Sequence, residues 1–456
     1  MVRRGLLLPA ALGALLLGCA GDETTAPPSG GPPALAEAST DALVQEVRER
    51  AAARGIGPLG RPAPVRPELV RLGQALAFDK ILSGNRDISC MTCHLPSLGT
   101  GDARSLSIGQ GGVGLGADRV HPDGAFIPRN APPAFNLHAI GPFFWDGRVV
   151  RDPEGHFVTP AKQRVQPHMT RAFEFGALSA LPLFPVLSRE EMRAEAGNEL
   201  AAVSDKQPQQ VWNRLMDRLG RIGEYRRLFE AAYPGTRYAE MNFGHASNAI
   251  AGFLIDRLAF TDSPWDRFLA GDDAALTEVQ LRGARNFLTA RCSVCHNGPA
   301  LTDNLFHNVA VAQFGPGQGD GPSGRDDFGR MRETGRAADR YAFRTPPLRN
   351  VELTAPYGHD GAFFSLREFI AHYSESHVKL RSFDGSELEP ALRGTLLANV
   401  EDILATRDTL LDGVVFDDVT IDEVTEFMTA LTDPAARNLS AIVPAGVPSG
   451  LPVDGP

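Results

Sequence analysis

The chain has 456 residues, of which 43% are hydrophobic, enough for two or three domains with cores of their own. Its formal net charge of −10 gives no basic surface of the kind that gathers phosphate backbones, so we expect no nucleic-acid partner. The 47 glycines and 35 prolines argue against a coiled coil or a dense sheet, and they predict long irregular connections between helices.

The N-terminus has the features of a lipoprotein signal peptide over residues 1–18. Two arginines precede an apolar run over residues 5–17, and this run of 13 residues is shorter than the roughly 20 that a transmembrane helix needs. We expect Cys19 to carry the lipid, so that this lipid is the only membrane contact. An ordinary secretory signal and a buried helix are the alternatives. Ala20 favours the periplasmic face of the outer membrane over the inner one.

The stretch after the signal lacks the apolar residues that a core requires. It begins with Thr, Pro, Gly, Ser and Ala, and we expect residues 19–60 to form a flexible tether. A helix is predicted from Pro67 to about Ser83, because leucines recur on one face at spacings of three and four. These leucines are Leu69, Leu72 and Leu76.

Two Cys-x-x-Cys-His motifs carry the clearest chemical signal. In this motif two thiols add to the vinyl groups of a haem, and the adjacent histidine supplies a nitrogen to the iron. A zinc or thioredoxin-like site would need further cysteines or a βαβ context, and the only other cysteine is Cys19. We therefore predict two covalently bound haem c groups. Their attachment residues are Cys90, Cys93 and His94 for the first, and Cys292, Cys295 and His296 for the second.

The chain repeats this arrangement, since a second helix is expected over residues 276–289, just before the second motif. The predicted fold is mainly α, with two cytochrome c-like haem domains, long irregular loops and little β. We assign residues 61–240 to the first domain and 241–440 to the second. Residues 315–329, rich in Gly and Asp, are expected to form a surface loop, and residues 441–456 a disordered tail.

Four further segments resemble the signature blocks of the bacterial di-haem cytochrome c peroxidase and MauG family, and they occur in the family's order. The resemblance extends over about residues 67–435. The blocks are Arg-Asn-Ala-Pro-Pro-Ala-Phe-Asn at 129–136, Phe-Trp-Asp-Gly-Arg at 144–148, Arg-Thr-Pro-Pro-Leu-Arg-Asn at 344–350, and Ala-Pro-Tyr-Gly-His-Asp-Gly at 355–361.

The resemblance implies an oxidoreductase that reduces hydrogen peroxide to water. Its electrons would come from a small cytochrome or another protein donor, and a MauG-like oxidation of a partner protein is a variant of the same chemistry. Family members often form homodimers, and nothing in the sequence specifies a contact patch. A non-catalytic di-haem electron-transfer cytochrome is the alternative from a different class. For that alternative both irons would be six-coordinate.

The resemblance also assigns roles to residues. It implies that His94 serves the peroxidatic iron, that His296 serves an electron-relay iron, and that Trp145 lies between the two haems. A core aromatic is the alternative for Trp145. The family holds a calcium ion between the haems with an Asn side chain and backbone carbonyls, an oxygen-only set that suits this cation. The matching positions are Asn130, Thr354 and Pro356.

Cleavage of the peroxide O–O bond needs a group that moves a proton from one oxygen to the other. The family places a Glu before a Met, and Glu191 matches best. The alternative is that Glu190 and Glu191 open a solvated helix. If Glu191 is not the acid, Glu190 and Glu174 are the next candidates. The family's nearby Gln has no counterpart at its aligned position, and Gln163 and Gln166 are the candidates to replace it.

The first haem departs from many of the peroxidases at one ligand position. Where they place a histidine within Ser-Ile-Gly-His that caps the resting iron, this chain has Gln110. The first iron is therefore expected to be open without prior reduction, with His121 as an alternative ligand.

The second haem departs as well. The peroxidases usually place a methionine where this chain has Tyr373, and MauG also carries a tyrosine there. Residues 366–373 are helical by pattern, with Tyr373 on the apolar face, and no methionine occurs between Met331 and Met428. We predict that Tyr373 ligates the second iron. A core tyrosine, or ligation by His372 or His377, are the alternatives.

Overall fold

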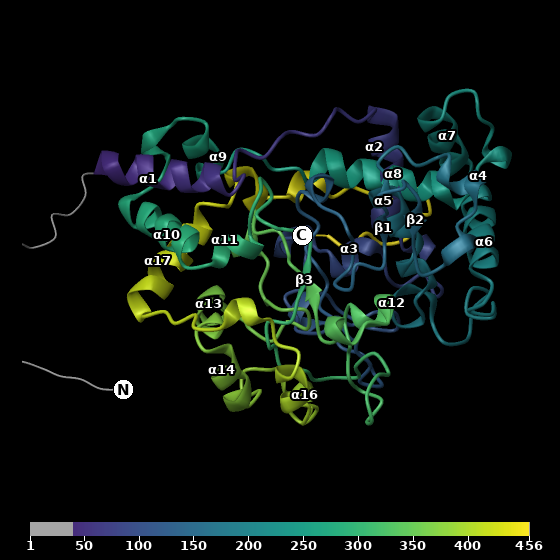
Figure 1. The fold of residues 1–456 in the computed structure, drawn as a ribbon. Coiled ribbons are helices and arrows are strands. Elements are labelled where there is room, and N and C mark those ends of the chain that lie inside the picture. The colour runs from purple at the N-terminus through teal and green to yellow at the C-terminus, as the bar shows by residue number, and fades with distance from the viewer. Residues whose placement is uncertain (1–39, 456) are drawn as a thin grey trace, which may run out of the picture. The chain divides into compact units, whose positions relative to one another are not determined.

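The computed structural model describes residues 40–455 (Figure 1). The predicted signal peptide, Cys19 and the first part of the predicted tether lie outside the described residues. Helices dominate, and the strands form two short antiparallel pairs, which confirms a mainly α fold with little β. The strands are β1 (Val150–Arg151) with β2 (Phe157–Val158), and β3 (Phe306–His307) with β4 (Phe343–Arg344). Within residues 40–455 no helix has the length and hydropathy needed to cross a bilayer.

The helices fall into two series along the chain, joined by short 3₁₀ turns and long loops. The first series is α1 (Thr40–Ala53), α2 (Pro67–Phe78), α3 (Cys90–Cys93), α4 (Pro167–Thr170), α5 (Ala177–Ala180), α6 (Pro208–Gly220), α7 (Gly223–Ala232) and α8 (Phe243–Arg257). The second is α9 (Pro264–Leu269), α10 (Glu278–Thr289), α11 (Cys292–Cys295), α12 (Met331–Thr334), α13 (Leu366–Tyr373), α14 (Ser376–Ser382), α15 (Pro390–Arg393), α16 (Val400–Leu404) and α17 (Asp418–Thr429).

The helices predicted next to the two motifs are present. α2 begins at Pro67 as expected but ends at Phe78, because the Asp79 side chain accepts the Ile81 amide at 2.9 Å and starts a 3₁₀ turn. α10 ends at the expected residue, and α13 has the expected bounds. The spacing of apolar residues within each segment is therefore enough to predict these three helices, without any tertiary contact.

One helix crossing is repeated in the two halves of the chain. In α2, a Cβ on Gly73 would lie 1.9 Å from the Ala249 carbonyl oxygen of α8. In α10, a Cβ on Gly283 would lie 1.9 Å from the Glu423 carbonyl oxygen of α17. Only glycine permits so close an approach of two helix backbones. A glycine at the contact point thus allows the close packing of the helix pair next to each motif, α2 with α8 and α10 with α17.

A second repeated feature is an asparagine whose side chain bonds a distant backbone amide in each half. Asn136 and Asn350 both adopt left-handed backbone conformations, with φ of 54° and 63°. The Asn136 side chain accepts the Phe260 amide at 2.7 Å, and the Asn350 side chain accepts the Asp433 amide at 2.9 Å. Each asparagine therefore binds the segment that follows the second helix of the crossing, α8 in the first half and α17 in the second.

The cores divide the chain differently from the sequence prediction. The first core includes α2, α6, α7 and also α8, whereas the second gathers α1, α10 and α17. A boundary between residues 240 and 241 would separate α8 from α2. The reason is the glycine-mediated crossing, which joins these two helices although more than 160 residues separate them.

The predicted tether is structured from residue 40 onward, which corrects that part of the prediction. α1 presents Leu43, Val44, Val47 and Ala51 on one face, and all four side chains are buried. They pack into the second core beside α10 (Figure 1). Burial of this apolar stripe outweighs the polar composition of the neighbouring residues.

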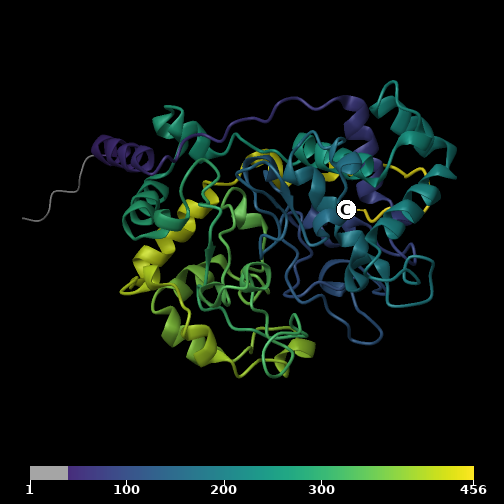
Figure 2. The same cartoon turned by 45° about the vertical axis from the view of Figure 1, so that its right-hand side comes forward.

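The predicted disordered tail also differs in the structure. Residues 441–455 run back to the first core, where Ile442 and Val447 are buried (Figures 1 and 2). The Asp454 side chain is buried with them. Composition alone suggested disorder, but the first core leaves apolar surface that this segment covers.

Candidate active site

The two Cys-x-x-Cys-His motifs fold in the same way. Each pair of cysteines brackets a single helical turn, α3 or α11, and the histidine follows directly. Nδ1 of His94 lies 3.0 Å from the Thr100 carbonyl oxygen, and Nδ1 of His296 lies 3.0 Å from the Leu301 carbonyl oxygen. Such a bond orients the ring and leaves Nε2 as the nitrogen for a metal.

Burial disfavours a free thiolate at three of the four motif cysteines. Burial raises the pKa of the Cys90 thiol to about 11 and that of Cys292 to about 12, and it also raises the pKa of Cys93. Nucleophilic and zinc-binding cysteines have lowered pKa values. None of the four described cysteines forms a disulfide. Both motifs therefore fit covalent haem attachment.

A cavity opens beside the second motif. It holds about 1670 Å³ of empty space, which includes open solvent at its mouth. Cys292, Cys295 and His296 line it, as does Phe287 of α10. A mainly apolar lining with the cysteines and the histidine on its wall suits a porphyrin.

Tyr373 lines the same cavity, and burial raises the pKa of its phenol well above the ordinary value. The two histidine alternatives lie elsewhere. Nε2 of His372 lies 2.9 Å from the Val309 carbonyl oxygen, and the His377 side chain is exposed. Of the three candidate ligands, only Tyr373 lines the cavity. Its hydroxyl makes no hydrogen bond to a backbone group of the described residues, in contrast to the His372 ring.

The three residues of the predicted calcium set come together on the wall of this cavity. Asn130, Thr354 and Pro356 all line it, although more than 200 residues separate Asn130 from the other two. The Asn130 side-chain nitrogen donates to the Arg104 carbonyl oxygen at 2.9 Å. This bond orients the amide and leaves its oxygen as the available acceptor.

Trp145 is fixed between the two halves of the chain. Its indole is 8% exposed and donates from Nε1 to the Asn130 carbonyl oxygen at 2.9 Å. Its own carbonyl oxygen accepts the Arg344 amide at 2.8 Å. Because the ring also lines the cavity of the second motif, Trp145 connects the segment that carries Asn130 to that cavity.

Glu191 lies on a π-helical turn, Arg189–Arg193, whose first residues are capped by the Ser188 side chain at 3.2 Å. Burial raises the pKa of the Glu191 carboxyl to about 7, with Arg148 and Arg129 opposing the rise. The Glu191 carbonyl oxygen accepts the Gln110 backbone amide at 2.9 Å, and the Ile108 carbonyl oxygen, two residues before Gln110, lies 3.9 Å from Cys93 Sγ, so the Glu191 turn lies beside the first motif. Its neighbour Glu190 is exposed, so the solvated-helix alternative describes Glu190 but not Glu191.

Gln110 lies against the same turn. Its backbone N–H donates to the carbonyl oxygens of Glu190 at 3.2 Å and Glu191 at 2.9 Å. Its side-chain Nε2 donates to the Asp87 carboxylate at 3.2 Å. His121 packs beside the following residue, Gly111, where a Cβ would lie 2.8 Å from the imidazole Nε2. The position of the family's capping histidine is therefore adjacent to the candidate acid.

The remaining acid and amide candidates are placed elsewhere. Both oxygens of Glu174 pair with Arg66, at 2.8 and 2.9 Å, and one also accepts from Asn248. Gln166 is exposed, and the side chain of Gln163 lies outside the described residues. Glu191 is the candidate acid that the structure places beside the first motif.

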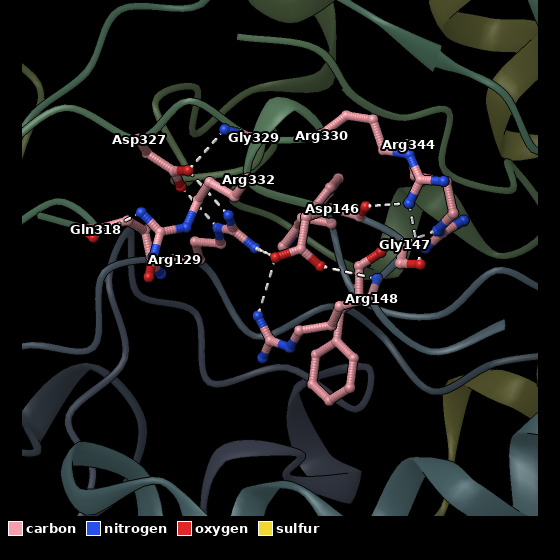
Figure 3. A network of polar contacts seen from close by, with 12 residues as sticks. Arg129, Asp146, Gly147, Arg148, Gln318, Asp327, Gly329, Arg330, Arg332 and Arg344 are labelled. Carbon is pink, nitrogen blue, oxygen red and sulfur yellow. Dashed lines mark hydrogen bonds and ion pairs between the residues drawn. The ribbon is translucent and has the colours of Figure 1, made fainter. Parts of the chain in front are cut away.

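The sequence did not identify a buried ionic network between the halves (Figure 3). Arg129 donates to both oxygens of Asp327 and, at 2.5 Å, to Asp146, which also accepts from Arg148 at 3.1 Å. These partners hold the pKa of the Asp146 carboxyl at about 2 and lower the pKa of Asp327. Asp327 lies in the segment expected to form a surface loop, yet it is 4% exposed. Arg129, Asp146 and Arg148 stand in the blocks at 129–136 and 144–148, but nothing in those blocks indicated Asp327 as their partner.

Comparisons with known proteins agree with this geometry. The family described as di-haem cytochrome c peroxidase matches residues 67–274. Methylamine utilization protein MauG of Methylorubrum extorquens is 28% identical over 89% of this chain and 97% of the relative. Cytochrome c551 peroxidase of Pseudomonas aeruginosa is 32% identical over 68% of this chain and 73% of the relative. A crystal structure of a MauG-like protein associated with microbial copper homeostasis matches 84% of this chain and 94% of that protein, with a TM-score of 0.56 and 25% identity.

Proposed function

This chain belongs to the di-haem cytochrome c peroxidase family, and from that premise we propose how its own residues carry out the reaction. It is an oxidoreductase that uses hydrogen peroxide and carries two haem c groups. One hydrogen peroxide, two electrons and two protons yield two waters. In our proposal each haem belongs to a cytochrome c-like domain, and peroxide reacts at the first motif while electrons arrive through the second.

The observation that carries this assignment is the half-buried Glu191, whose turn lies beside the first motif. A general acid–base group works best when its pKa lies near the working pH, and the pKa of Glu191 is raised to about 7. Bound haem supplies the one-electron redox chemistry at both sites. Glu191 takes the proton from one peroxide oxygen and returns it to the other, so that the second oxygen leaves as water. Gln110 supports the Glu191 turn through its backbone amide.

Trp145 is the proposed link between the two haems. It is held at both its indole nitrogen and its carbonyl oxygen, and it contacts residues from both halves of the chain. A fixed aromatic ring shortens the gap through which electrons tunnel. The calcium ion that we propose at Asn130, Thr354 and Pro356 would stiffen the same region, because Asn130 also accepts the Trp145 hydrogen bond.

Tyr373 and His296 would both hold the iron of the second haem, since both line the same cavity. A phenolate is anionic and favours oxidised iron over reduced iron. This arrangement favours a MauG-like reaction, in which residues of a partner protein are oxidised, over simple electron uptake from a small cytochrome. Purified protein mixed with peroxide and a reduced cytochrome c tests the choice. Rapid oxidation of the cytochrome supports the peroxidase variant, and peroxide-dependent oxidation of a partner protein supports the MauG-like variant.

The proposed location is the periplasmic face of the outer membrane, with the lipid on Cys19 as the anchor. The lipobox-like run before Cys19 supports this. Labelling of cells with a radioactive or clickable fatty acid, compared between the natural chain and Cys19→Ser, tests it. Gel filtration with light scattering of the chain without its first 19 residues tests the homodimer that family members often form.

The non-catalytic electron carrier is the alternative function. A carrier needs both irons six-coordinate and low-spin, whereas a catalyst keeps one position open. No histidine stands at the position of Gln110, which favours an open first iron. Electron paramagnetic resonance of the resting protein decides: a high-spin ferric signal supports catalysis, and two low-spin signals support the carrier.

A further inference from the structure

The end of the chain reaches the first Cys-x-x-Cys-His motif. Thr92, between the two cysteines of that motif, donates its hydroxyl to the Asp454 carboxylate, 362 residues away in the sequence. The other Asp454 oxygen pairs with the Lys80 ammonium at 2.6 Å. Thr92 is 1% exposed and Asp454 is 6% exposed, so both groups are removed from water.

Thr92 also holds the start of its own helical turn. Its Oγ1 accepts the Ser89 amide at 2.9 Å, which closes the capping interaction at the beginning of α3. A hydroxyl has one proton to donate and two lone pairs with which to accept. When the Thr92 hydroxyl donates its hydrogen bond to Asp454, its lone pairs are free to accept the Ser89 amide. The bond to Asp454 and the cap on α3 therefore reinforce each other.

Residues of the C-terminal tail that precede Asp454 are also hydrogen-bonded to the first core. The Asp79 carboxylate, fully buried at the end of α2, accepts from the Ser449 hydroxyl and the Tyr225 hydroxyl, each at 2.6 Å. Gln74 donates to the Ile442 carbonyl oxygen at 2.8 Å. Residues 442–454 are thus bound at three successive points, all on elements of the first core. We name residues 442–455 the C-terminal clasp.

The second motif provides an internal comparison. The residue equivalent to Thr92 is Val294, which has no hydroxyl, and α11 is instead supported by Ser293 donating to Leu288 at 3.1 Å. The clasp bonds only the first motif. A device confined to one of two otherwise similar motifs points to a requirement of the first haem.

We propose that Asp454 is a positioning residue of the first haem site, which acts through Thr92 to hold Cys90, Cys93 and His94 in place. The proposal rests on the proposed attachment of haem to Cys90 and Cys93. Asp454 does not touch the reacting atoms. Its carboxylate instead fixes the short turn whose last residue precedes the iron-binding histidine, so that loosening the clasp changes the first haem and leaves the second unaltered.

The test uses the full-length holoenzyme, with the second haem as an internal reference. Asp454→Ala and Thr92→Val should each broaden or shift the electron paramagnetic resonance signal of the first haem, and amide exchange over residues 89–94 should become at least about tenfold faster. The double variant should show no change beyond that of Thr92→Val, since that substitution already removes the bond to Asp454 together with the cap on Ser89. Asp454→Asn keeps an acceptor for Thr92 and should restore the parental signal.

Ser449→Ala is the matched control, because it weakens the clasp at Asp79 without touching Thr92. It should leave the first haem signal as in the parent. Equal changes at both haems, unchanged signals in Asp454→Ala and Thr92→Val, or failure of Asp454→Asn to restore the signal would each overturn the proposal. Where Asp454→Ala gives no holoenzyme, Thr92→Val decides, because it retains the tail packing. A parent protein that carries only one haem by mass would contradict the proposed attachment instead.

Discussion

Arg129 and Asp327, 198 residues apart in the sequence, are joined by two parallel hydrogen bonds of 2.6 and 2.8 Å. Arg129 bonds Asp146 at the same time, so one guanidinium compensates two buried carboxylates. Asp146 immediately follows Trp145 in the sequence. This network therefore locks the two halves of the chain together at the residue proposed to connect the haems.

Arg129→Gln should lower the free energy of unfolding by about 3–5 kcal/mol, because it leaves the buried Asp327 carboxylate without its cation and Asp146 with Arg148 alone. The pKa of Asp146 is about 2, below its ordinary value, so its stabilisation is present above about pH 4 and is lost as the pH falls through about 2. The difference between parent and variant should accordingly be larger at pH 7 than at pH 3 in urea unfolding. Arg66→Gln, at the exposed pair with Glu174, is the control and should cost at most about 1 kcal/mol. Similar losses for both variants would contradict the network's role.

Replacing Cys292 and Cys295 with Ala should leave one covalent haem by mass spectrometry. The cavity that these residues line would lose the group that fills it, so the second core should unfold at a lower temperature. Retention of two covalent haems would refute the assignment of the second motif.

Glu191→Gln should slow peroxide turnover by at least about tenfold, since positioned proton transfer contributes about 10²–10⁴-fold. In the parent, the rate of reaction with peroxide should rise as the pH increases through about 7, because only the ionised carboxylate accepts the peroxide proton. The variant should lose this pH dependence in stopped-flow measurements. Glu190→Gln is the control, because its side chain is exposed: it should retain the rate and the pH dependence, with the profile moved to lower pH, since the Glu190 charge contributes to the raised pKa of Glu191. Unchanged turnover in Glu191→Gln would assign the acid to another residue.

Trp145→Phe should leave peroxide binding at the first haem nearly intact while slowing electron transfer between the haems. Phe keeps the buried aromatic volume but loses the indole hydrogen bond to Asn130. Rapid-mixing spectra that resolve the two haems give the rate. Should both haems become oxidised as fast as in the parent, Trp145 does not link them.

Tyr373→Phe should alter the spectrum of the second haem, because the proposed oxygen ligand is removed. Tyr373→Met should raise its reduction potential, since a neutral ligand stabilises ferrous iron better than a phenolate does. Redox titration of each variant measures the change. His372→Gln is the control, as that ring bonds a backbone carbonyl and should leave the potential unaltered. An unchanged spectrum in Tyr373→Phe would show that the tyrosine is not a ligand.

The sequence by itself determined the features whose information is local. Five successive residues define each haem motif, and apolar spacing within one helix predicted α2, α10 and α13. The block at 144–148 also indicated Trp145 as a candidate, a Glu before a Met indicated Glu191, and the position where the peroxidases place a methionine indicated Tyr373.

The tertiary structure alone decided which segments share a core and which charges meet. The sequence interpretation assigned α1 to a tether, the C-terminal clasp to disorder and Asp327 to a surface loop, whereas all three are buried against distant segments. Composition reports whether a segment can form a core of its own, but not whether a core elsewhere in the chain leaves apolar surface for it to cover. The same holds for Glu191: its raised pKa arises from desolvation by its surroundings, and desolvation exists only once residues far apart in the sequence have packed together.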